Sequence, residues 1–465
     1  MDPLLFEPGC GTVKERVLAG SRLVYRAFEG IVYCAKPVDQ IQKLNLFVPE
    51  VYYHGESIRG YALKTAPIFV PNSVGGYMPG AMEEPGMNDR LGEPNAIFQA
   101  LHHGYVVVSP GIRGRSLGPC GKAPALAVDM KAVVRYLRHN RESVPGDVER
   151  IITSGTSAGG ALSAMTGSSG NSPDFEPYLE AIGAAQERDD IFAANCYCPI
   201  HNLEHADMAY EWLFSGESDY YWRNTTPAGT LTKKQQALSR ELKAAFSAYL
   251  NSLNLTDTQK RKLTLDEDGN GSFRDYVEKL LLESANEELH TYGASGRLKK
   301  LAIPGSDAGT QSYLTYRNGR AVKLDWARYA KAVTRMKPVP AFDALDLSSP
   351  ENDEFGTQGN PAQFFTPFAI AHSKVAGTLA EEKLIRMLNP LYYIGSADTA
   401  PYWRIRYGAY DRDTALAIPV ILALTLQNKG FSTDFRLPWG LPHSGDYDLE
   451  ELFSWIDRIC EKTEN

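Results

Sequence analysis

Cysteine is scarce in this sequence and is not arranged for metal binding. The chain of 465 residues contains six cysteines. They are Cys10, Cys34, Cys120, Cys196, Cys198 and Cys460. No C-x-x-C pair or zinc spacing occurs, so we expect no bound metal. We expect the thiols to be reduced, as in a cytoplasm. Cys196 and Cys198 alternate in "FAANCYCPI", which predicts two positions on the same face of a buried strand.

Long apolar runs and basic clusters are also missing. No stretch approaches the ~20 apolar residues that a membrane helix requires. Residues 1–20 lack a basic region followed by an apolar run, so we expect no signal peptide. The formal net charge is −8 and the pI is near 5.7. These features argue against nucleic acid and membranes as partners and predict a soluble, cytoplasmic protein.

The first 200 residues alternate strand-like and helix-like segments. Apolar runs at 22–35, 43–49, 66–76 and 104–116 are typical of strands. Residues 126–140, "LAVDMKAVVRYLRHN", carry apolar side chains at helical spacing. This order predicts an α/β fold built around a largely buried sheet.

The sequence pattern changes near residue 202, and the earlier pattern returns near residue 389. Charged helical runs such as "TKKQQALSRELKAAFSAYLNSL" dominate this middle part, and we interpret it as an inserted cap. Strand and helix patterns then resume in "PYWRIRYG" and "TALAIPVILALTLQNKG". The predicted organisation is therefore a core at 1–201, an inserted lid at 202–389 and the rest of the core at 390–465.

A G-x-S-x-G motif follows one of the predicted strands. In "RIITSGTSAGGALSAMTG" the strand leads directly to Ser157, and a run of small residues follows it. A strand, a sharp turn at serine and a helix with small side chains form the nucleophile elbow of α/β-hydrolases. Ser157 is therefore the predicted nucleophile.

The partners of this serine should follow in the order acid, then histidine. Asp411 and Asp413 both follow the predicted strand "YWRIRYG", and sequence position alone leaves the choice between them open. His443 lies between the final strand and the last helix, where the base should lie. Asp446 is a third candidate for the acid, but it is too close to His443 for the usual topology.

These residues predict a serine hydrolase that needs no cofactor. Ser157 would attack an ester carbonyl while His443 takes its proton. The backbone N–H of Ala158 is one expected oxyanion donor. The other should come from the "NSVGGY" loop, from Gly75 or Gly76.

Several long motifs make the prediction more specific. The sequences "GTSAGG", "RYGAYDRDTALAIPV", "LPWGLPHSGDYDLEELFSWI" and "RMKPVPAFDALDLSSPENDEFG" resemble those of bacterial tannases, the tannin acyl hydrolases of the intracellular type. The likeness extends over nearly the whole chain. It implies an α/β-hydrolase fold with a lid domain, and cleavage of galloyl esters and depsides.

The resemblance also assigns residues. The family's triad falls on Ser157, Asp411 and His443, and its galloyl-binding residues fall on Lys337, Glu351 and Asp413. Carboxylates can accept hydrogen bonds from adjacent phenolic hydroxyls, and an ammonium group favours a polarised phenol. A broader carboxylesterase acting on feruloyl or other hydroxyaryl esters, a peptidase of the same fold and a noncatalytic binding protein remain alternatives.

Two further motifs are weaker. "HNLEH", His201 to His205, matches the H-x-x-E-H pattern of some zinc peptidases, but no third ligand is evident. "DEDGNGSF" resembles a calcium loop, yet its twelfth position is Val277, where a bidentate glutamate is required. We expect a histidine–glutamate cluster in the first and an acidic turn that leads into a helix in the second.

Overall fold

A nine-stranded sheet forms the centre of the computed structural model, which describes residues 2–222, 228–292 and 313–461. The strand order is β1-β2-β3-β7-β4-β8-β9-β14-β15. The strands are β1 (Thr12–Leu18), β2 (Ser21–Val32), β3 (Lys43–Pro49), β4 (Pro67–Pro71), β7 (Val106–Pro110), β8 (Asp147–Thr156), β9 (Ala193–Tyr197), β14 (Tyr402–Arg406) and β15 (Ser432–Arg436). β1, β2, β3 and β7 pair antiparallel, whereas the pairs from β7 through β4 to β15 are parallel.

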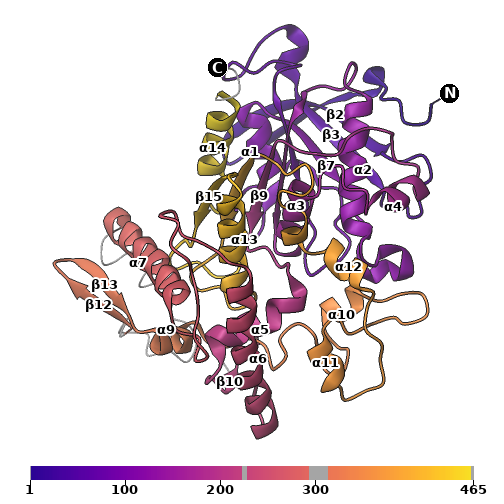
Figure 1. Ribbon diagram of the computed structural model, residues 1–465. Coiled ribbons are helices and arrows are strands. Elements are labelled where there is room, and N and C mark those ends of the chain that lie inside the picture. The colour runs from indigo at the N-terminus through magenta and orange to yellow at the C-terminus, as the bar shows by residue number, and fades with distance from the viewer. Residues whose placement is uncertain (1, 223–227, 293–312, 462–465) are drawn as a thin grey trace.

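Helices cover both faces of this sheet (Figure 1). On one face lie α1 (Ala96–His103) and α14 (Leu449–Glu461), and on the other lie α2 (Ala125–His139), α3 (Ala158–Ser168) and α13 (Ala417–Asn428). Successive residues of β8 serve the two faces: Ile151 packs with the second group of helices and Ile152 with the first. A strand buried on both faces has to be apolar throughout, which explains the continuous hydrophobic runs.

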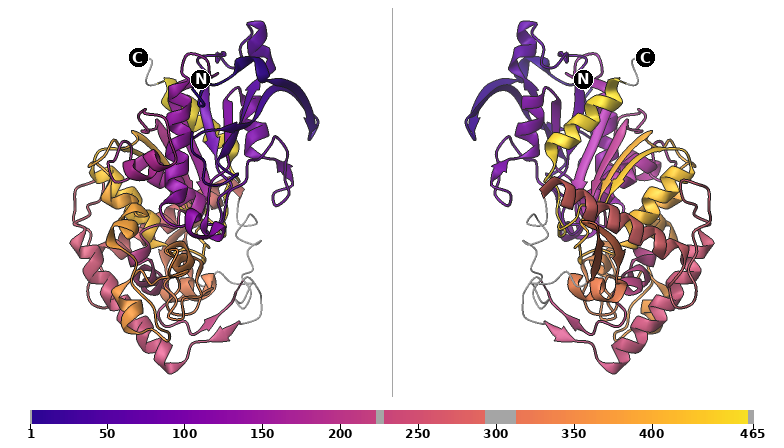
Figure 2. Two further views of the ribbon diagram at one scale, coloured as in Figure 1. Left: turned by 90° about the vertical axis from the view of Figure 1, so that its right-hand side faces the viewer. Right: turned by 90° about the vertical axis from the view of Figure 1, so that its left-hand side faces the viewer.

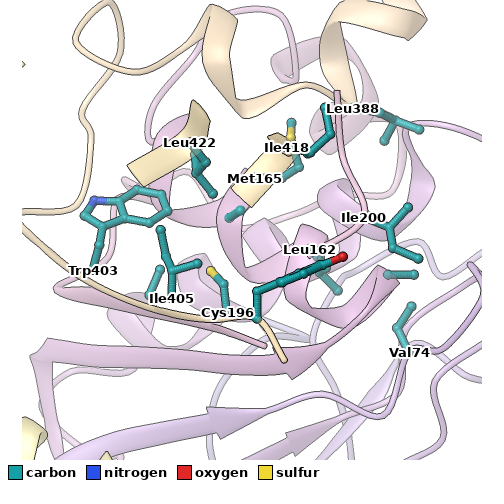
Figure 3. Packing of buried hydrophobic residues seen from close by; sticks show 14 of the residues in the cluster. Val74, Leu162, Met165, Cys196, Ile200, Leu388, Trp403, Ile405, Ile418 and Leu422 are labelled. Carbon is teal, nitrogen blue, oxygen red and sulfur yellow. The ribbon is translucent and has the colours of Figure 1, made fainter. Parts of the chain in front are cut away.

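The core beside α3 is closely packed (Figure 3). Leu162 and Met165 of α3 lie against Cys196 of β9 and against Ile405 of β14, with Ile418 of α13 beyond them. Gly167 faces the Trp403 ring, and a Cβ there would lie 2.9 Å from two atoms, one of them in that ring. The small residues after the predicted nucleophile therefore let α3 approach the sheet.

The chain between β9 and β14, as far as the structure describes it, adds no strand to the central sheet. Its elements are α5 (Leu203–Phe214), β10 (Asp219–Tyr220), β11 (Gly229–Thr230), α6 (Lys233–Ser252), α7 (Ser272–Tyr292), β12 (Leu314–Arg317), β13 (Arg320–Leu324), α9 (Trp326–Val333), α10 (Pro350–Glu354), α11 (Pro367–Ala371) and α12 (Glu382–Met387). They gather at one end of the sheet, and both chain termini lie at the other end (Figures 1 and 2). That this segment, near the predicted 202–389, is a separate lid domain remains a prediction.

The structure corrects the prediction for Cys198. Cys196 lies within β9, but Cys198 follows the strand with a φ of 44°, so the two thiols are not alternate positions of one strand. The chain turns here to leave the sheet for α5. No helix among the described residues is long and apolar enough to cross a membrane.

Candidate active site

Ser157 occupies a sharp turn between β8 and α3. Its φ of 88° lies in the left-handed region, which is costly for a residue with a side chain. Hydrogen bonds on both sides hold this conformation: the Ser157 N–H donates to the Tyr197 carbonyl at 2.9 Å, and the Ile200 N–H donates to the Ser157 carbonyl at 3.1 Å. A Cβ on Gly160 would lie 2.5 Å from the same Tyr197 carbonyl, so the helix needs glycine there.

Ser157, His443 and Asp411 form a continuous chain of hydrogen bonds. The Ser157 Oγ lies 2.9 Å from Nε2 of His443, and Nδ1 of the same ring lies 2.7 Å from Oδ2 of Asp411. The parallel register brings the carboxyl ends of β8, β9, β14 and β15 into line, and each of the three residues follows one of these strands.

The local hydrogen bonds distinguish Asp411 from Asp413 and Asp446 as the carboxylate that is held against His443. The Asp411 side chain, in a residue only 1% exposed, accepts the backbone N–H groups of Asp413 at 2.8 Å and of Thr414 at 3.2 Å. It also accepts the Thr414 hydroxyl at 3.1 Å. A carboxylate fixed in this way can orient the imidazole. Asp413 instead lies on the Nε2 side of His443, with Oδ2 3.9 Å from that nitrogen.

Two buried groups, the Asp411 carboxylate and the Cys198 thiol, lie beside the His443 ring. Burial alone would lower its pKa, but the Asp411 carboxylate outweighs burial and raises the pKa well above the ordinary value. Behind the pair lies the thiol of Cys198, which donates to the Ser444 carbonyl at 3.3 Å. Burial raises the pKa of this thiol, so it remains neutral beside the ring. Sequence reasoning missed this neighbour because the two cysteines were assigned to a strand.

The residues expected to supply the oxyanion donors lie near the serine. Ala158 is the first residue of α3, where a backbone N–H has no acceptor within the helix. The loop with Gly75 and Gly76 follows β4 and lines the same cleft as Ser157. Both glycine carbonyls are engaged, that of Gly75 by the Met78 N–H at 2.9 Å and that of Gly76 by Arg115 Nε at 2.8 Å. These bonds fix the loop beside the serine.

Asn72 ties that loop to the elbow, and the sequence analysis did not identify it. Its Nδ2 donates to the carbonyls of Ser154 at 2.9 Å and of Gly159 at 3.2 Å. Its Oδ1 accepts the Val74 N–H at 3.3 Å. A Cβ on Gly155 would lie 2.4 Å from the Asn72 amide, so glycine is needed for this contact. The only signal in the sequence is an asparagine directly after a buried strand.

Lys337, Glu351 and Asp413 line the same cleft as Ser157 and His443, a cleft of about 840 Å³. Lys337 Nζ lies 2.9 Å from Oδ1 of Asp413. Burial disfavours the Lys337 ammonium, but the carboxylates of Asp413 and Glu351 outweigh burial and raise its pKa. Burial raises the pKa of Glu351, against the effect of Lys337. This part of the cleft thus combines one ammonium with the carboxylates of Asp413 and Glu351.

A buried ion pair supports this group. Arg335 and Glu211 are both fully buried, and Arg335 NH1 donates to Glu211 Oε1 at 2.8 Å. The hydroxyl of Tyr210 accepts the backbone N–H groups of Met336 at 3.0 Å and of Lys337 at 3.3 Å. α5 therefore fixes the backbone that presents Lys337. Residues 124 positions apart carry no pairing signal in one sequence.

The "HNLEH" motif does not form the geometry of a zinc peptidase. α5 begins at Leu203, so His201 precedes the helix and does not share a helical face with His205. Burial lowers the pKa of His201 to about 3. The Nδ1–H of His205 donates to Asn202 Oδ1 over 2.7 Å, and the ring stacks on Tyr249. Within the described residues, the one cluster of three possible metal ligands is Cys198, Asp411 and His443.

The "DEDGNGSF" segment forms an acidic turn before α7. The Asp266 side chain accepts the backbone N–H groups of Asp268 at 3.0 Å and of Asn270 at 2.8 Å. The side-chain oxygen of Asn270 accepts from Arg274. Two of the oxygens expected to bind a cation are thus used inside the turn, as expected for a structural turn.

Comparisons with known proteins agree with this geometry. The family described as BD-FAE matches residues 74–208. Esterase LipQ from Mycobacterium tuberculosis is 31% identical over 90 residues, which are 19% of this chain and 20% of that protein. The matched part therefore spans about a fifth of the curated relative.

Solved structures match almost the whole chain. The tannin acyl hydrolase from Lactobacillus plantarum is 49% identical with a TM-score of 0.92, over 98% of this chain and 99% of that one. A tannin acyl hydrolase in complex with ethyl gallate gives the same values. The Fusobacterium nucleatum tannase is 45% identical with a TM-score of 0.90, over 98% and 99% of the two chains. This chain has the α/β-hydrolase fold and is an ester hydrolase that belongs to the bacterial tannases.

Proposed function

We propose that this enzyme hydrolyses galloyl esters and depsides through Ser157, His443 and Asp411, and releases gallic acid. One observation carries the proposal: the hydrogen-bonded chain from Ser157 to Asp411 opens on the same cleft as Lys337, Glu351 and Asp413. Similarity to a tannin acyl hydrolase in complex with ethyl gallate supports the choice of ester.

The reaction begins at the elbow. His443 Nε2, 2.9 Å away, takes the proton of Ser157 as Oγ attacks the ester carbonyl. The oxyanion accepts hydrogen bonds from the Ala158 N–H and from an N–H of Gly75 or Gly76. The imidazolium is stabilised by Asp411 and then protonates the departing alcohol. Water, activated by the same ring, hydrolyses the acyl-enzyme.

The acyl group is selected by the charged end of the cleft. Three adjacent phenolic hydroxyls are donors, and the carboxylates of Glu351 and Asp413 are acceptors. Lys337 lies 2.9 Å from Asp413 and favours a polarised phenol. An acyl ring without these hydroxyls would displace water from the two carboxylates without supplying hydrogen-bond donors in its place, and a site built to bind hydroxyls in this way rejects such analogues strongly.

The segment between β9 and β14 acts in this proposal as a lid, because Lys337 and Glu351 belong to it while Ser157 belongs to the core. We also place the enzyme in the cytoplasm. Six free thiols support this location, since a reducing compartment keeps cysteines unpaired. The partner of the enzyme is a small-molecule ester.

The test compares methyl gallate with methyl 4-hydroxybenzoate and methyl ferulate. Ser157→Ala should abolish hydrolysis of all three. Lys337→Met should raise KM for methyl gallate by at least tenfold and change the other two much less, because it removes a charged contact worth about 1.5–3 kcal/mol.

A second result would favour the broader carboxylesterase. In that case the unsubstituted enzyme hydrolyses the three esters at comparable rates, and Lys337→Met affects them equally. Lys337 packs over the Phe342 ring at 4.2 Å, so Lys337→Met also changes a packing contact. A melting temperature close to that of the parent is therefore needed to show that the kinetic change is not a loss of stability.

A further inference from the structure

The cleft has a second charged wall that the reaction described above does not use. Besides Lys337, Glu351 and Asp413, which we call the Lys337 group, the lining of the cleft includes Glu83, Asp446 and Arg90. The charges around Asp446 are Glu83, Asp448, Arg90 and Arg404, whereas those around Glu351 are Lys337, Asp413 and Arg115. The two groups thus differ in their nearest charges, and both line the cavity that contains the nucleophile.

The second wall is built next to the elbow. Gly445 packs against Thr156 so closely that a Cβ would lie 1.9 Å from the Thr156 Oγ1. This contact places Asp446 beside the residue that precedes Ser157. Asp446 has a φ of 58°, a conformation that aspartate and asparagine tolerate better than most residues.

Hydrogen bonds fix the rest of this wall. The guanidinium of Arg90 donates to the hydroxyl of Ser444, next to the catalytic histidine. The Glu83 N–H donates to Ser109 Oγ at 2.8 Å. The hydroxyl of Ser73, in the oxyanion loop, donates to the Ala81 carbonyl at 2.7 Å. The backbone that carries Glu83 is thus tied to the sheet and to the oxyanion loop.

The two carboxylates of this wall have no internal donors. Among the described residues, neither Glu83 nor Asp446 accepts a hydrogen bond at its side chain, in contrast to Asp411. Burial raises the pKa of Glu83, and burial together with the Glu83 charge raises the pKa of Asp446 to about 6. Glu83 is exposed and Asp446 is half-buried, so both carboxylates are open to the cleft, where water or a ligand supplies their donors.

The chemistry of a suitable ligand follows. Two neighbouring carboxylates are acceptors only, so the ligand must present hydroxyl donors at adjacent positions. The wall lies next to the nucleophile, and its nearest charges differ from those of the Lys337 group. It therefore faces the part of the ester that leaves first, the alcohol.

We propose that Glu83 and Asp446 form a leaving-alcohol subsite that binds vicinal hydroxyl groups. The inference rests on the proposed function, because it needs the galloyl ring to occupy the Lys337 group. Vicinal hydroxyls occur both in a sugar and in a second trihydroxyphenyl ring. The subsite accordingly favours gallate esters of polyhydroxylated alcohols over those of simple alkyl alcohols.

The experiment compares a monogalloyl glucose, a galloyl gallate depside and methyl gallate as substrates. Glu83→Gln and Asp446→Asn, singly and together, keep the size of each side chain but turn part of the acceptor into a donor. Asn also suits the left-handed backbone at position 446. Glu84→Gln is the matched control, since Glu84 is an exposed neighbour paired with Arg16. The readout is the ratio of kcat/KM for each polyhydroxylated ester to that for methyl gallate, which does not depend on the folded fraction.

The double substitution should lower this ratio about tenfold, while Glu84→Gln leaves it unchanged. A fall for the glucose ester alone assigns the subsite to a sugar, and a fall for the depside alone assigns it to a second ring. An unchanged ratio for both esters overturns the subsite. So does an equal loss on all three, which would indicate a general effect on His443.

A second measurement uses the acyl-enzyme. With glucose added to a methyl gallate reaction, the parent should form some glucose ester beside free gallate, and the double variant should form about tenfold less per gallate released. Equal partitioning in both overturns the subsite. If the parent hydrolyses no gallate ester at all, the proposed function itself has failed, and this result is distinct from an unchanged ratio.

Discussion

Asp411 and Asp413 are two residues apart and face opposite nitrogens of the His443 ring. Asp411 Oδ2 is 2.7 Å from Nδ1, and Asp413 Oδ2 is 3.9 Å from Nε2, the nitrogen that also contacts Ser157. The turn between them is closed by the Asp413 N–H donating to Asp411 at 2.8 Å. In the proposed mechanism, one short turn thus supplies both the group that orients the base and a group that faces the substrate.

Substitutions of the two aspartates should therefore change different kinetic parameters. Asp411→Asn should lower kcat on methyl gallate by about 10⁴-fold, because an amide at this position stabilises the wrong tautomer of the histidine. Asp413→Asn should act mainly on KM and on the preference for gallate over 4-hydroxybenzoate. Steady-state kinetics on both esters separates the two effects. Equal losses of kcat in the two variants would contradict the assignment.

Asn72 should matter for catalysis although it does not touch the triad. Asn72→Asp keeps an acceptor for the Val74 N–H but loses the donors to Ser154 and Gly159. The oxyanion loop would then be less fixed, and kcat should fall by at least tenfold, up to the 10²–10³-fold cost of losing a donor outright. KM for methyl gallate should change little. A variant with the parental kcat would show that the loop is held by other contacts.

Activity should depend on pH through His443. The base must be neutral, so kcat/KM should fall as the pH drops through its pKa in the free enzyme. Because Asp411 stabilises the imidazolium, that pKa lies above the ~6.5 of a free histidine, and the acid limb should have its midpoint above this value. A pH series of kcat/KM on methyl gallate measures it. A midpoint below 6.5 would show that burial outweighs the carboxylate.

The patterns of the sequence predicted the elements on which the site is built. The segment 43–49 is a strand with those bounds, and the predicted helix 126–140 is α2, one residue earlier at each end. Both elements are largely buried, and each shows the hydrophobic pattern of its type along its whole length. β1 was not predicted, because its exposed edge position permits the charged sequence "TVKERVL". Hydrophobic patterning reports burial, and an edge strand with little burial leaves little pattern.

From the sequence pattern alone, the roles of side chains were predictable only where the chain order fixes them, and the remaining assignments came from the resemblance to bacterial tannases. Ser157 and His443 each follow a distinct strand, so topology singled them out. Asp411 and Asp413 follow the same strand, and the choice between them depends on a turn whose hydrogen bonds cannot be read from spacing. Asn72 and the Arg335–Glu211 pair act through contacts between distant parts of the chain, and a single sequence does not record such contacts.

That buried pair allows a test of how the insertion holds Lys337. Arg335→Met would leave the Glu211 carboxylate fully buried and, among the described residues, with only the Ser239 hydroxyl, 2.6 Å away, as a donor. Removing one partner of a buried pair costs about 3–5 kcal/mol, whereas replacing both by apolar groups is often nearly neutral. The free energy of unfolding should thus fall in Arg335→Met and recover largely in Arg335→Met with Glu211→Leu.

The kinetics of the double variant then separate stability from positioning. Arg335 also donates to the Lys337 carbonyl at 3.3 Å, and the apolar pair cannot replace this bond. We therefore expect the recovered chain to have a raised KM for methyl gallate and a nearly parental KM for methyl 4-hydroxybenzoate. If urea unfolding shows recovery and both KM values are parental, the ion pair stabilises the insertion without positioning Lys337, and the Tyr210 hydroxyl alone suffices.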